Sequence, residues 1–426
     1  MTRDSKSSFW LTRVLSGGGI LVYFVIAFEF MIMISPFAMF FYSVFNPVLL
    51  FLSHYSATRW LTGFFLPHMV FPPSLFLRGI RILGSALFVL GAVIFVVCAL
   101  QVYLGKILKR GVATWGLYRV IRHPQYLGLA VTSAGLSILW PRLFTLASLA
   151  LMLVLYYFLA RNEEGRMTRA HGDTYRTLVA RTGMFLPRWL ERPLAALVPE
   201  RGQRVFQTVA VPVVMVAVVL GAGFALRALT VSELPKQTAG NLTVVSILPE
   251  DNGFLASVVG TLAASEQHLS DSLALDPQKR YLGYLMPVDY VMQGMIANTG
   301  DRSQLYKHHH TVAMISDWII HPFRHLRETP AMCEHMPPGH TMAMARRNLC
   351  PLYVNNPSTD CANCPYRRVV LVEVAANHAG SQQLFSLGTA RTPVGYLDLD
   401  VHAHKVVDAQ RVPNVTAWEA VPTPVF

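Results

Sequence analysis

The run Ile82–Leu104, ILGSALFVLGAVIFVVCALQVYL, decides how this chain is built. It contains no charged residue, and the basic residues Lys106, Lys109 and Arg110 follow it directly. A helix needs about 20 apolar residues to cross the roughly 30 Å of hydrocarbon in a bilayer. The run therefore predicts a membrane-spanning helix that ends in a basic loop.

Three further apolar stretches extend this prediction to a membrane domain. Leu127–Ala160 is long enough for two helices, and Trp140-Pro141-Arg142 interrupts it where a hairpin would turn, because proline breaks a helix. Val205–Leu226 predicts one more span. Gly18–Leu52 contains two prolines and fits either one span with a kinked extension or two tight passes.

The charge distribution divides the chain into two halves. Its formal charge of +12 comes from 36 Lys and Arg against 24 Asp and Glu. Residues 1–230 hold 22 basic and 7 acidic residues, a net charge of +15, whereas residues 231–426 hold 14 and 17, a net charge of −3. We expect an α-helical integral membrane bundle of about five spans in residues 1–230, followed by a soluble α+β domain in residues 231–426.

The basic excess does not indicate nucleic-acid binding. A nucleic-acid-binding surface needs its basic side chains on one solvated face, whereas here they alternate with long apolar runs. Loops rich in Lys and Arg stay on the cytoplasmic side of a membrane. The loops 105–125 and 161–204 are rich in basic residues, so we expect both to face the cytoplasm from an inner or plasma membrane.

That orientation places residues 231–426 on the opposite, extracytoplasmic side. We expect the N-terminus to be retained, because the apolar stretch after Arg13 is longer than the roughly 7–15 apolar residues of a signal peptide. The extracytoplasmic half has the composition of a globular domain. Its strand-like runs are Leu242–Leu248, Arg368–Val374 and Tyr396–Val401, and its helix-like runs are Phe254–Leu273 and Val312–Leu326.

Four of the five cysteines lie in this half: Cys333, Cys350, Cys361 and Cys364. An even set suits two disulfides in an oxidising compartment, with three pairings open. Eleven of the 15 histidines also follow residue 230, so a metal or haem-type site or a redox-active Cys-x-x-Cys are alternatives. Since the cysteine spacings match no zinc signature well, we assign no metal ligand. A protein or small-molecule partner of this half stays open.

The stretch most informative about function precedes the predicted hairpin. It reads Gly116-Leu-Tyr118-Arg-Val-Ile-Arg122-His123-Pro124-Gln-Tyr126-Leu-Gly128. Because Pro124 suits the first turn of a helix, the polar residues before it would lie at a helix N-terminus. Free N–H groups and the helix dipole attract anionic groups there, so the stretch favours a site that holds a carboxylate.

A second polar stretch, Arg161-Asn-Glu163-Glu164, follows the hairpin, with Gly172, Tyr175 and Pro187-Arg188 downstream. Adjacent carboxylates near the membrane surface can bind a cation, an amine or ribose hydroxyls. Each stretch alone has a simpler explanation, as an interfacial anchor or as a solvated helix face. Together they offer groups for a zwitterionic ligand.

The combination of these motifs resembles the isoprenylcysteine carboxyl methyltransferase and phospholipid methyltransferase superfamily over roughly residues 75–190. The resemblance implies S-adenosylmethionine (SAM) bound at the cytoplasmic face of a helical bundle. It also implies a lipophilic acceptor that enters from the bilayer. The positions that it assigns to cofactor binding are Tyr118, Arg122, His123, Pro124, Tyr126, Gly128, Glu163 and Glu164.

Four further residues are candidates for catalysis. Arg161, Tyr175 and Arg188 belong to the second stretch, and the last two match weaker downstream positions of the superfamily. Glu29 is a carboxylate in an otherwise apolar run. An ionisable residue inside a membrane is a functional candidate by default, although a structural ion pair would explain it equally well.

Methyl transfer asks for little acid–base chemistry, because the sulfonium of SAM already activates its methyl group. Catalysis is then mainly alignment and dehydration of the nucleophile. We expect a membrane-embedded, SAM-dependent methyltransferase that acts on an isoprenylcysteine-type carboxylate or a phospholipid amine. The alternative is a degenerate methyltransferase scaffold that anchors an extracytoplasmic metal-binding, redox or ligand-binding domain.

Overall fold

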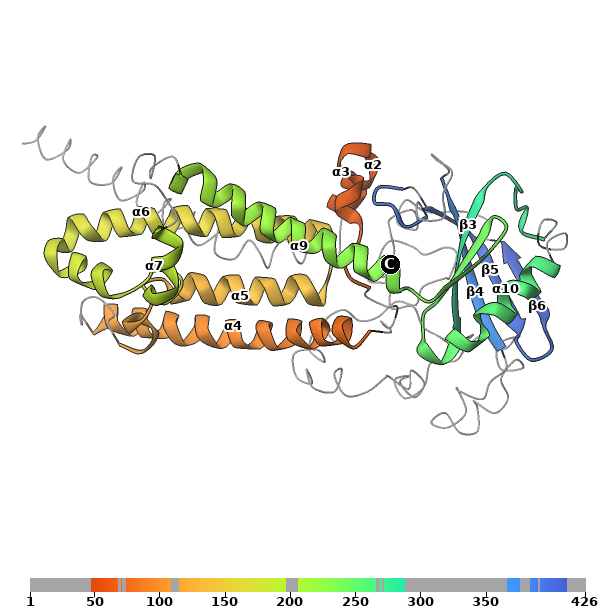
Figure 1. Cartoon of the computed structure of the whole chain (residues 1–426), viewed down its shortest axis with the longest axis horizontal. Helices are drawn as coiled ribbons and strands as arrows, with labels where there is room; N and C mark the ends of the chain where they lie inside the picture. Colours follow the sequence, from red (N-terminus) through yellow and green to blue (C-terminus); the bar gives the residue numbers. More distant parts are fainter. Residues whose placement is uncertain are drawn as a thin grey trace, which may run out of the picture. The chain divides into compact units, whose positions relative to one another are not determined.

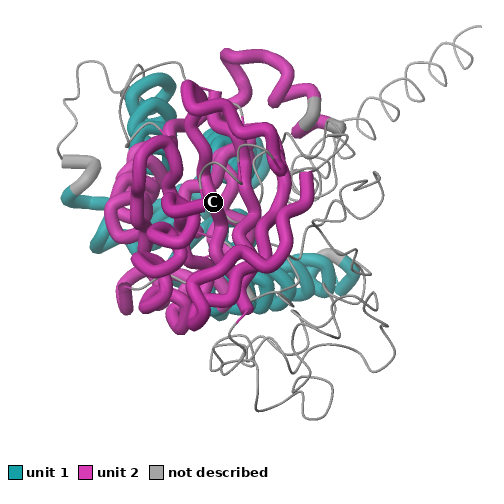
Figure 2. The backbone as a smooth tube through the Cα atoms, turned by 90° about the vertical axis from the view of Figure 1, so that its right-hand side faces the viewer, with its two compact units in different colours: residues 1–41, 86–137, 145–220 teal, residues 42–85, 138–144, 221–426 magenta. Residues whose placement is uncertain are grey.

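The computed structural model describes residues 47–67, 70, 74–108, 115–196, 206–265, 269, 272–287, 366–375, 384–389 and 391–411. Glu29, most of the predicted span Gly18–Leu52, the helix-like run Val312–Leu326 and the four C-terminal cysteines lie outside these residues. The chain forms two compact units, drawn in separate colours in Figure 2. Unit 1 contains the described residues of 86–137 and 145–220, and unit 2 contains those of 42–85, 138–144 and 221–426.

Three helices of the described chain are long and apolar enough to cross a membrane. α4 (Leu75–Ile107) contains the predicted span Ile82–Leu104, and α6 (Leu143–Arg181) and α9 (Val211–Glu233) follow two other predicted apolar runs. The single-turn π-helix η3 (Phe206–Ala210) leads into α9. The prediction of about five spans goes beyond these three helices and stays a prediction, as does the domain boundary at residue 230.

The predicted hairpin is confirmed. α5 (Pro124–Leu139) begins at the expected proline, Trp140, Pro141 and Arg142 form the turn, and α6 begins at Leu143. With 16 residues, α5 is about 24 Å long at 1.5 Å per residue. It is therefore shorter than a typical complete crossing.

In unit 1, α5 packs closely against α4 on one side and α6 on the other. Figure 1 shows α5 between these two helices. A Cβ atom on Gly91 would lie 2.3 Å from Thr132 N, and one on Gly128 would lie 2.7 Å from Phe95 N. Glycines at these positions let the α4 and α5 backbones approach each other, as small residues do in membrane helix pairs. Leu129 of α5 packs with Met152 and Tyr156 of α6, which fixes the helix on its other side.

The C-terminal half of the described chain forms a six-stranded mixed sheet in chain order. Its strands are β1 (Lys236–Ala239), β2 (Leu242–Ser246), β3 (Arg280–Pro287), β4 (Tyr366–Val374), β5 (Arg391–Asp400) and β6 (Lys405–Arg411). Only the β2–β3 pair is parallel, and α10 (Leu255–Ala264) lies in the connection between these two strands. A parallel pair needs such a crossover because a tight turn can join only antiparallel strands.

The three predicted strands correspond to β2, β4 and β5, whereas sequence reasoning missed β1, β3 and β6. The predicted helix Phe254–Leu273 is shorter than expected, since α10 ends at Ala264. A 3-10 turn, η4 (Pro249–Phe254), precedes it. Among the described residues, the three expected strands and one of the two expected helices are therefore present, with different bounds.

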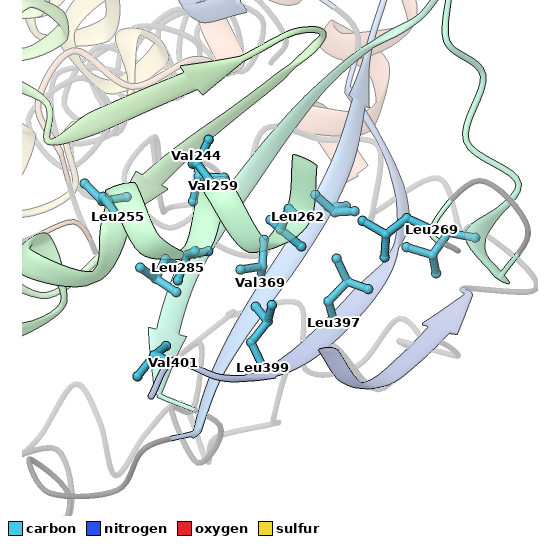
Figure 3. Packing of buried hydrophobic residues seen from close by; sticks show 13 residues of the cluster. Val244, Leu255, Val259, Leu262, Leu269, Leu285, Val369, Leu397, Leu399 and Val401 are labelled. Atoms are coloured by element: carbon cyan, nitrogen blue, oxygen red, sulfur yellow. The ribbon is translucent and has the colours of Figure 1, made fainter. Parts of the chain in front are cut away.

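The sheet buries apolar side chains on both faces. Val369 of β4 packs under α10 with Leu262 and Leu397, as Figure 3 shows. The adjacent Val370 points to the other face, because successive side chains of a strand alternate. There it belongs to a cluster that contains Leu234, the residue that directly follows α9. Residues next to the membrane helices thus cover the second face within unit 2.

Buried arginines hold these membrane-proximal segments of unit 2 together. Arg227 of α9 is buried and donates to the carbonyls of Phe64 and Phe385. Arg142 of the hairpin turn donates to the Thr62 carbonyl, and its guanidinium carbon lies 4.3 Å from the centre of the Phe64 ring. Charged side chains therefore satisfy backbone carbonyls that would otherwise be buried without a donor.

Candidate functional site

The loop before α5 is held against the segment that follows α6 in unit 1. Arg122 N donates to the Gly183 carbonyl at 2.9 Å, and His123 N donates to the Met184 carbonyl at 3.1 Å. In return, Gly183 N donates to the Val120 carbonyl at 3.1 Å. This short parallel bridge places Arg122 and His123 directly before Pro124, the first residue of α5.

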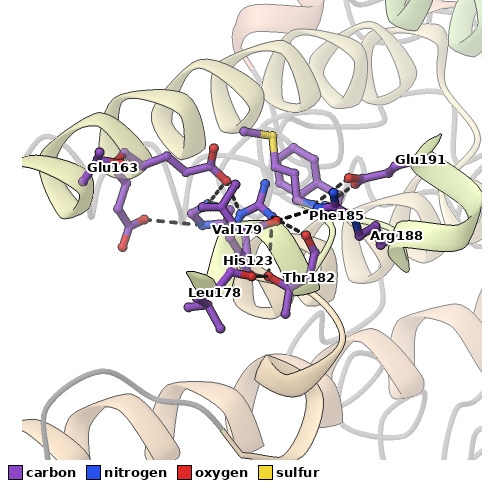
Figure 4. A network of polar contacts seen from close by, with 12 residues as sticks. His123, Glu163, Leu178, Val179, Thr182, Phe185, Arg188 and Glu191 are labelled. Carbon is purple, nitrogen blue, oxygen red and sulfur yellow. Dashed lines mark hydrogen bonds and ion pairs between the residues drawn. The ribbon is translucent and has the colours of Figure 1, made fainter. Parts of the chain in front are cut away.

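The two polar stretches singled out in the sequence meet at this point (Figure 4). Arg122 Nε lies 2.5 Å from Glu164 Oε1. His123 Nδ1 lies 3.6 Å from Glu163 Oε2, and its Nε2 lies 3.4 Å from Glu164 Oε1. The Glu163 side chain is 43% exposed, so this carboxylate keeps access to the surroundings. We refer to these four residues as the Arg–His–Glu–Glu cluster.

The end of α6 holds two arginines. Arg122 donates to the Thr182 carbonyl and, at 3.4 Å, to Thr182 Oγ1. Arg188 donates to the Val179 carbonyl at 2.7 Å. The last carbonyls of a helix carry the negative end of its dipole, which attracts cations. The α6 terminus therefore fixes Arg122 from the side opposite Glu164.

His123 is buried between aromatic rings. Its side chain is 6% exposed, and its ring centre lies 5.6 Å from that of Tyr126 and 5.9 Å from that of Phe185. Nε2 makes no hydrogen bond, although Glu164 Oε1 is near. Leaving a buried polar atom without a hydrogen bond costs about 1–3 kcal/mol. A ligand that offers a hydrogen-bonding group to this nitrogen would remove that cost.

Tyrosines complete the surroundings of the cluster. Tyr126 stacks on Tyr156, with ring centres 5.6 Å apart, and its hydroxyl donates to Glu163 Oε2 at 3.4 Å. Tyr118 lies on the 3-10 turn η2 (Gly116–Arg119) and is buried. Burial raises the pKa of the Tyr118 phenol, and the nearby Glu163 adds to the rise. A tyrosine phenol is protonated at neutral pH in any case, so Tyr118 can donate a hydrogen bond there.

The Arg–His–Glu–Glu cluster lies in a segment that matches a known family. Residues 79–174 match the phospholipid methyltransferase family. The matched segment contains nearly all of α4, all of α5 and the Arg–His–Glu–Glu cluster, and it ends before Gly183, α7 and the sheet. The match confirms the resemblance expected from the motifs.

Residues 79–174 thus resemble a membrane methyltransferase domain, and three helices of the described chain are long and apolar enough to cross a membrane. The matched segment does not extend into the C-terminal half. Comparison with curated proteins returns no match. Comparison with solved structures returns none either.

The remaining predicted site residues occupy different places. Pro124 starts α5, and Gly128 lies at the α4–α5 crossing. Tyr175 is buried on α6. Arg161 donates to Tyr157 Oη at 3.3 Å and lies over the same ring. Glu29 lies outside the described residues.

Sequence reasoning missed the turn that closes the site. The Glu191 carboxylate of α7 (Arg188–Ala196) accepts the N–H groups of Met184, Phe185 and Leu186 at 2.9, 2.9 and 3.0 Å. A Cβ atom on Gly183 would lie 1.8 Å from the Leu186 carbonyl oxygen. A glycine just after the last basic residue of a helix is a C-terminal signal, and Arg181-Thr-Gly183 has this form.

Metal binding finds no support in the part of the chain that the structure describes, where no group of three or more His, Cys, Asp or Glu could hold an ion. Of the C-terminal histidines, His402 and His404 are described, and His404 Nδ1 lies 2.8 Å from Ser257 Oγ. Cys98, the one cysteine among the described residues, is buried and free. The disulfide, metal and redox alternatives for the C-terminal half stay predictions.

Proposed function

We propose that this protein transfers the methyl group of SAM to a lipophilic acceptor, either a phospholipid amine or an isoprenylcysteine-type carboxylate. One observation carries the proposal. Arg122 and His123 meet Glu163 and Glu164 inside the segment that matches the phospholipid methyltransferase family. Charges of both signs are thereby held within one cluster at the start of α5.

The donor set of the cluster fits SAM, which carries a carboxylate, an ammonium group, a sulfonium and ribose hydroxyls. The buried His123 Nε2 has no hydrogen bond and can pair with a polar group of the cofactor. The half-exposed Glu163 can accept hydrogen bonds from an ammonium or a hydroxyl group. Arg122 and Glu164 form an ion pair next to His123 and Glu163.

Bound SAM supplies an electrophilic methyl group. The chain therefore has to bind the cofactor and the acceptor, align them with each other, and exclude water. The stacked Tyr126 and Tyr156 rings provide an apolar wall beside Glu163. A carboxylate acceptor needs no base. An ammonium acceptor must first lose a proton, and Glu163 is the carboxylate of the cluster most accessible to receive it.

The apolar surface beside the cluster supports a lipophilic acceptor. The C-terminal part of α4, which is hydrogen-bonded to Trp115 and Gln125, exposes Leu100, Tyr103 and Leu104. In a membrane this surface faces lipid chains, so an acceptor with a hydrophobic tail can approach from the bilayer. Following the basic loops, we place this site on the cytoplasmic side and the sheet domain on the opposite side.

A binding measurement tests the site. Full-length protein in lipid nanodiscs is titrated with SAM by calorimetry, and Glu164→Gln and His123→Ala are each expected to weaken the affinity by about tenfold or more, equivalent to about 1.4 kcal/mol. Asp173→Asn is the matched control, because Asp173 is an exposed acidic residue just beyond the kink at Gly172 that divides α6. Wild-type affinity in both cluster variants would rule out this site.

Acceptor identity needs a separate readout. Lipid extracts from cells with and without the protein are compared by mass spectrometry for products heavier by one methylene unit. A methylated phospholipid or a methylated prenyl-cysteine ester would separate the two acceptors. Absence of SAM binding to the wild-type protein would favour the alternative, a degenerate scaffold that carries the C-terminal domain.

A further inference from the structure

A surface of exposed apolar side chains adjoins the candidate site in unit 1. It comes from two segments, the turn 115–120 before α5 and residues 186–190, which lead into α7. Two tryptophans dominate it: Trp115 is 63% exposed and Trp189 is 71% exposed. Its other exposed members are Leu117, Val120, Leu186 and Leu190. We call these six side chains the α7 face.

The two segments of the α7 face are held together by backbone hydrogen bonds. Gly183 N donates to the Val120 carbonyl, and His123 N donates to the Met184 carbonyl. Glu191 then fixes the turn 184–186 through three N–H groups. The face is therefore a fixed surface built on the same bridge that positions His123.

The orientation of α7 is unusual for a helix in water. Its polar residues Arg188 and Glu191 point into the protein, where they bond the Val179 carbonyl and the turn 184–186 (Figure 4). Its apolar residues Trp189 and Leu190 are exposed. A surface helix normally buries the apolar side. Leu186, Trp189 and Leu190 thus expose three apolar side chains within five residues, and an exposed apolar patch marks a contact with a partner or a membrane.

The chain places the α7 face at the end of the membrane helices. α4 ends at Ile107 and α5 begins at Pro124, so the turn 115–120 lies between the C-terminus of α4 and the N-terminus of α5. A crossing that starts at Leu143 uses about 20 residues of α6 and ends near Glu163. The bridge holds residues 183–184 beside His123, and His123 lies next to Glu163, so the α7 face lies near the end of this crossing. Tryptophans are enriched at this depth, the interface between hydrocarbon and water.

The charges around the face indicate which surface it contacts. Arg119, Arg181 and Arg192 are exposed beside it, whereas the Glu191 carboxylate is occupied by the turn 184–186. A basic side chain near an anionic membrane surface raises binding by about fivefold. Apolar residues at interfacial depth and a surplus of arginines complement anionic lipid headgroups.

We propose that the α7 face binds the headgroup layer of an anionic bilayer leaflet, with α7 lying in the plane of the membrane. This interaction does not depend on SAM or on the acceptor, so it stands apart from the proposed methyl transfer. It adds a membrane contact that no spanning helix provides. Through Glu191, the contact also supports the turn that pairs with His123.

Photo-crosslinking of the full-length protein tests this contact. Trp189→p-benzoylphenylalanine and, separately, Trp115→p-benzoylphenylalanine are placed in nanodiscs of phosphatidylcholine alone or mixed with phosphatidylglycerol. Asp173→p-benzoylphenylalanine is the control, because the Asp173 side chain is 94% exposed and lies further along α6. After irradiation, lipid adducts are quantified by mass spectrometry on protein that elutes as a single peak in size-exclusion chromatography.

We expect lipid adducts at positions 189 and 115, with at least tenfold lower yield at 173. Anionic lipid should increase the adducts at 189, and Arg119→Gln combined with Arg192→Gln should remove about an order of magnitude of that preference. Equal yields at 189 and 173 would overturn the proposal. Adducts at 189 to a second copy of the chain in place of lipid, or equal yields with neutral and anionic lipid, would overturn it as well.

Discussion

Arg122 Nε lies 2.5 Å from Glu164 Oε1, although the two residues are 42 positions apart in the chain. α5 and the membrane part of α6 separate them in sequence, and the hairpin brings them back to the same level. Both side chains are largely buried. The pair therefore joins the segment before α5 to α6 at the candidate site, and its interaction energy can be measured.

The Arg122–Glu164 pair should show strong energetic coupling. Breaking a mostly buried pair leaves one charge without compensation, so Arg122→Ala and Glu164→Ala should each destabilise unit 1, and the double variant should lose less than the sum. We expect a coupling of about 1–3 kcal/mol from thermal unfolding of the four proteins in detergent. Arg176 and Asp173, whose side chains are 72% and 94% exposed, are the control pair, with an expected coupling of about 0.2–1 kcal/mol. Additive losses at Arg122 and Glu164 would contradict the contact.

Gly183→Ala should damage both stability and SAM binding. The added Cβ would lie 1.8 Å from the Leu186 carbonyl oxygen and 2.9 Å from Glu191 Oε2, so the turn after α6 must move and the bridge to Arg122 and His123 must distort. We expect a loss of about 2–4 kcal/mol, read as a lower unfolding temperature. Gly165→Ala is the matched control on α6, because its Cβ would meet nothing within 4 Å, and replacing an exposed helical glycine stabilises by up to about 1 kcal/mol. Similar effects of the two substitutions would argue against the tight turn.

Asp251 should give the sheet domain a distinctive pH dependence. Burial raises the pKa of the Asp251 carboxyl above its ordinary 3.8, against the opposing effect of Arg367, whose Nε lies 2.5 Å away. The folded chain then binds this proton more tightly than the unfolded chain does. The contribution of Asp251 to stability is therefore largest below pH 3.8 and declines as the pH rises through the raised pKa.

Asp251→Asn removes this titration. The unfolding free energy of the wild type, measured relative to that of the variant by denaturant titration, should decrease as the pH rises from about 3 to about 6. The comparison uses the difference between the two proteins, because other carboxyls titrate in both. Parallel curves across this range would contradict the raised pKa.

Arg227→Gln should loosen the two loops that pack against α9, one before α4 and one between β4 and β5. The guanidinium donates to the carbonyls of Phe64 and Phe385, and each hydrogen bond from a charged group contributes about 1.5–3 kcal/mol. Its loss should speed amide hydrogen exchange in residues 62–66 and 384–389, measured by mass spectrometry. Arg411→Gln, an exposed residue at the end of β6, should leave exchange in these loops unchanged. Wild-type protection in the Arg227 variant would show that the loops do not depend on it.

The membrane helices could be predicted because their signal is local. An uncharged run such as Ile82–Leu104 is long enough to cross a bilayer whatever it packs against. The hairpin turn and the start of α5 were predictable for the same reason, since Pro141 and Pro124 restrict the backbone wherever they occur. The two charged stretches could be recognised by residue type, and the family match covers both.

The strands β1, β3 and β6 were missed because their pattern depends on partners. β3 contains Gly283, where a Cβ atom would lie 2.8 Å from Val369 Cγ1 of β4. A glycine inside a strand weakens the local signal and becomes favourable only when a neighbour needs its space. Glu191 was missed for a similar reason, because a lone carboxylate on a short amphipathic helix looks solvated until the turn 184–186 is placed beside it.

The sequence by itself determined which segments are long and apolar enough to cross a membrane, where the hairpin turns, and which polar residues are available for a zwitterionic ligand. These properties follow from hydrophobicity, proline geometry and side-chain charge, which belong to individual residues. The tertiary structure decided the rest. It paired Arg122 with Glu164, left His123 Nε2 without a hydrogen bond, and turned Glu191 inward and Trp189 outward. Such relationships arise only when distant segments pack together, because hydrogen bonds and burial depend on distances that no local pattern contains.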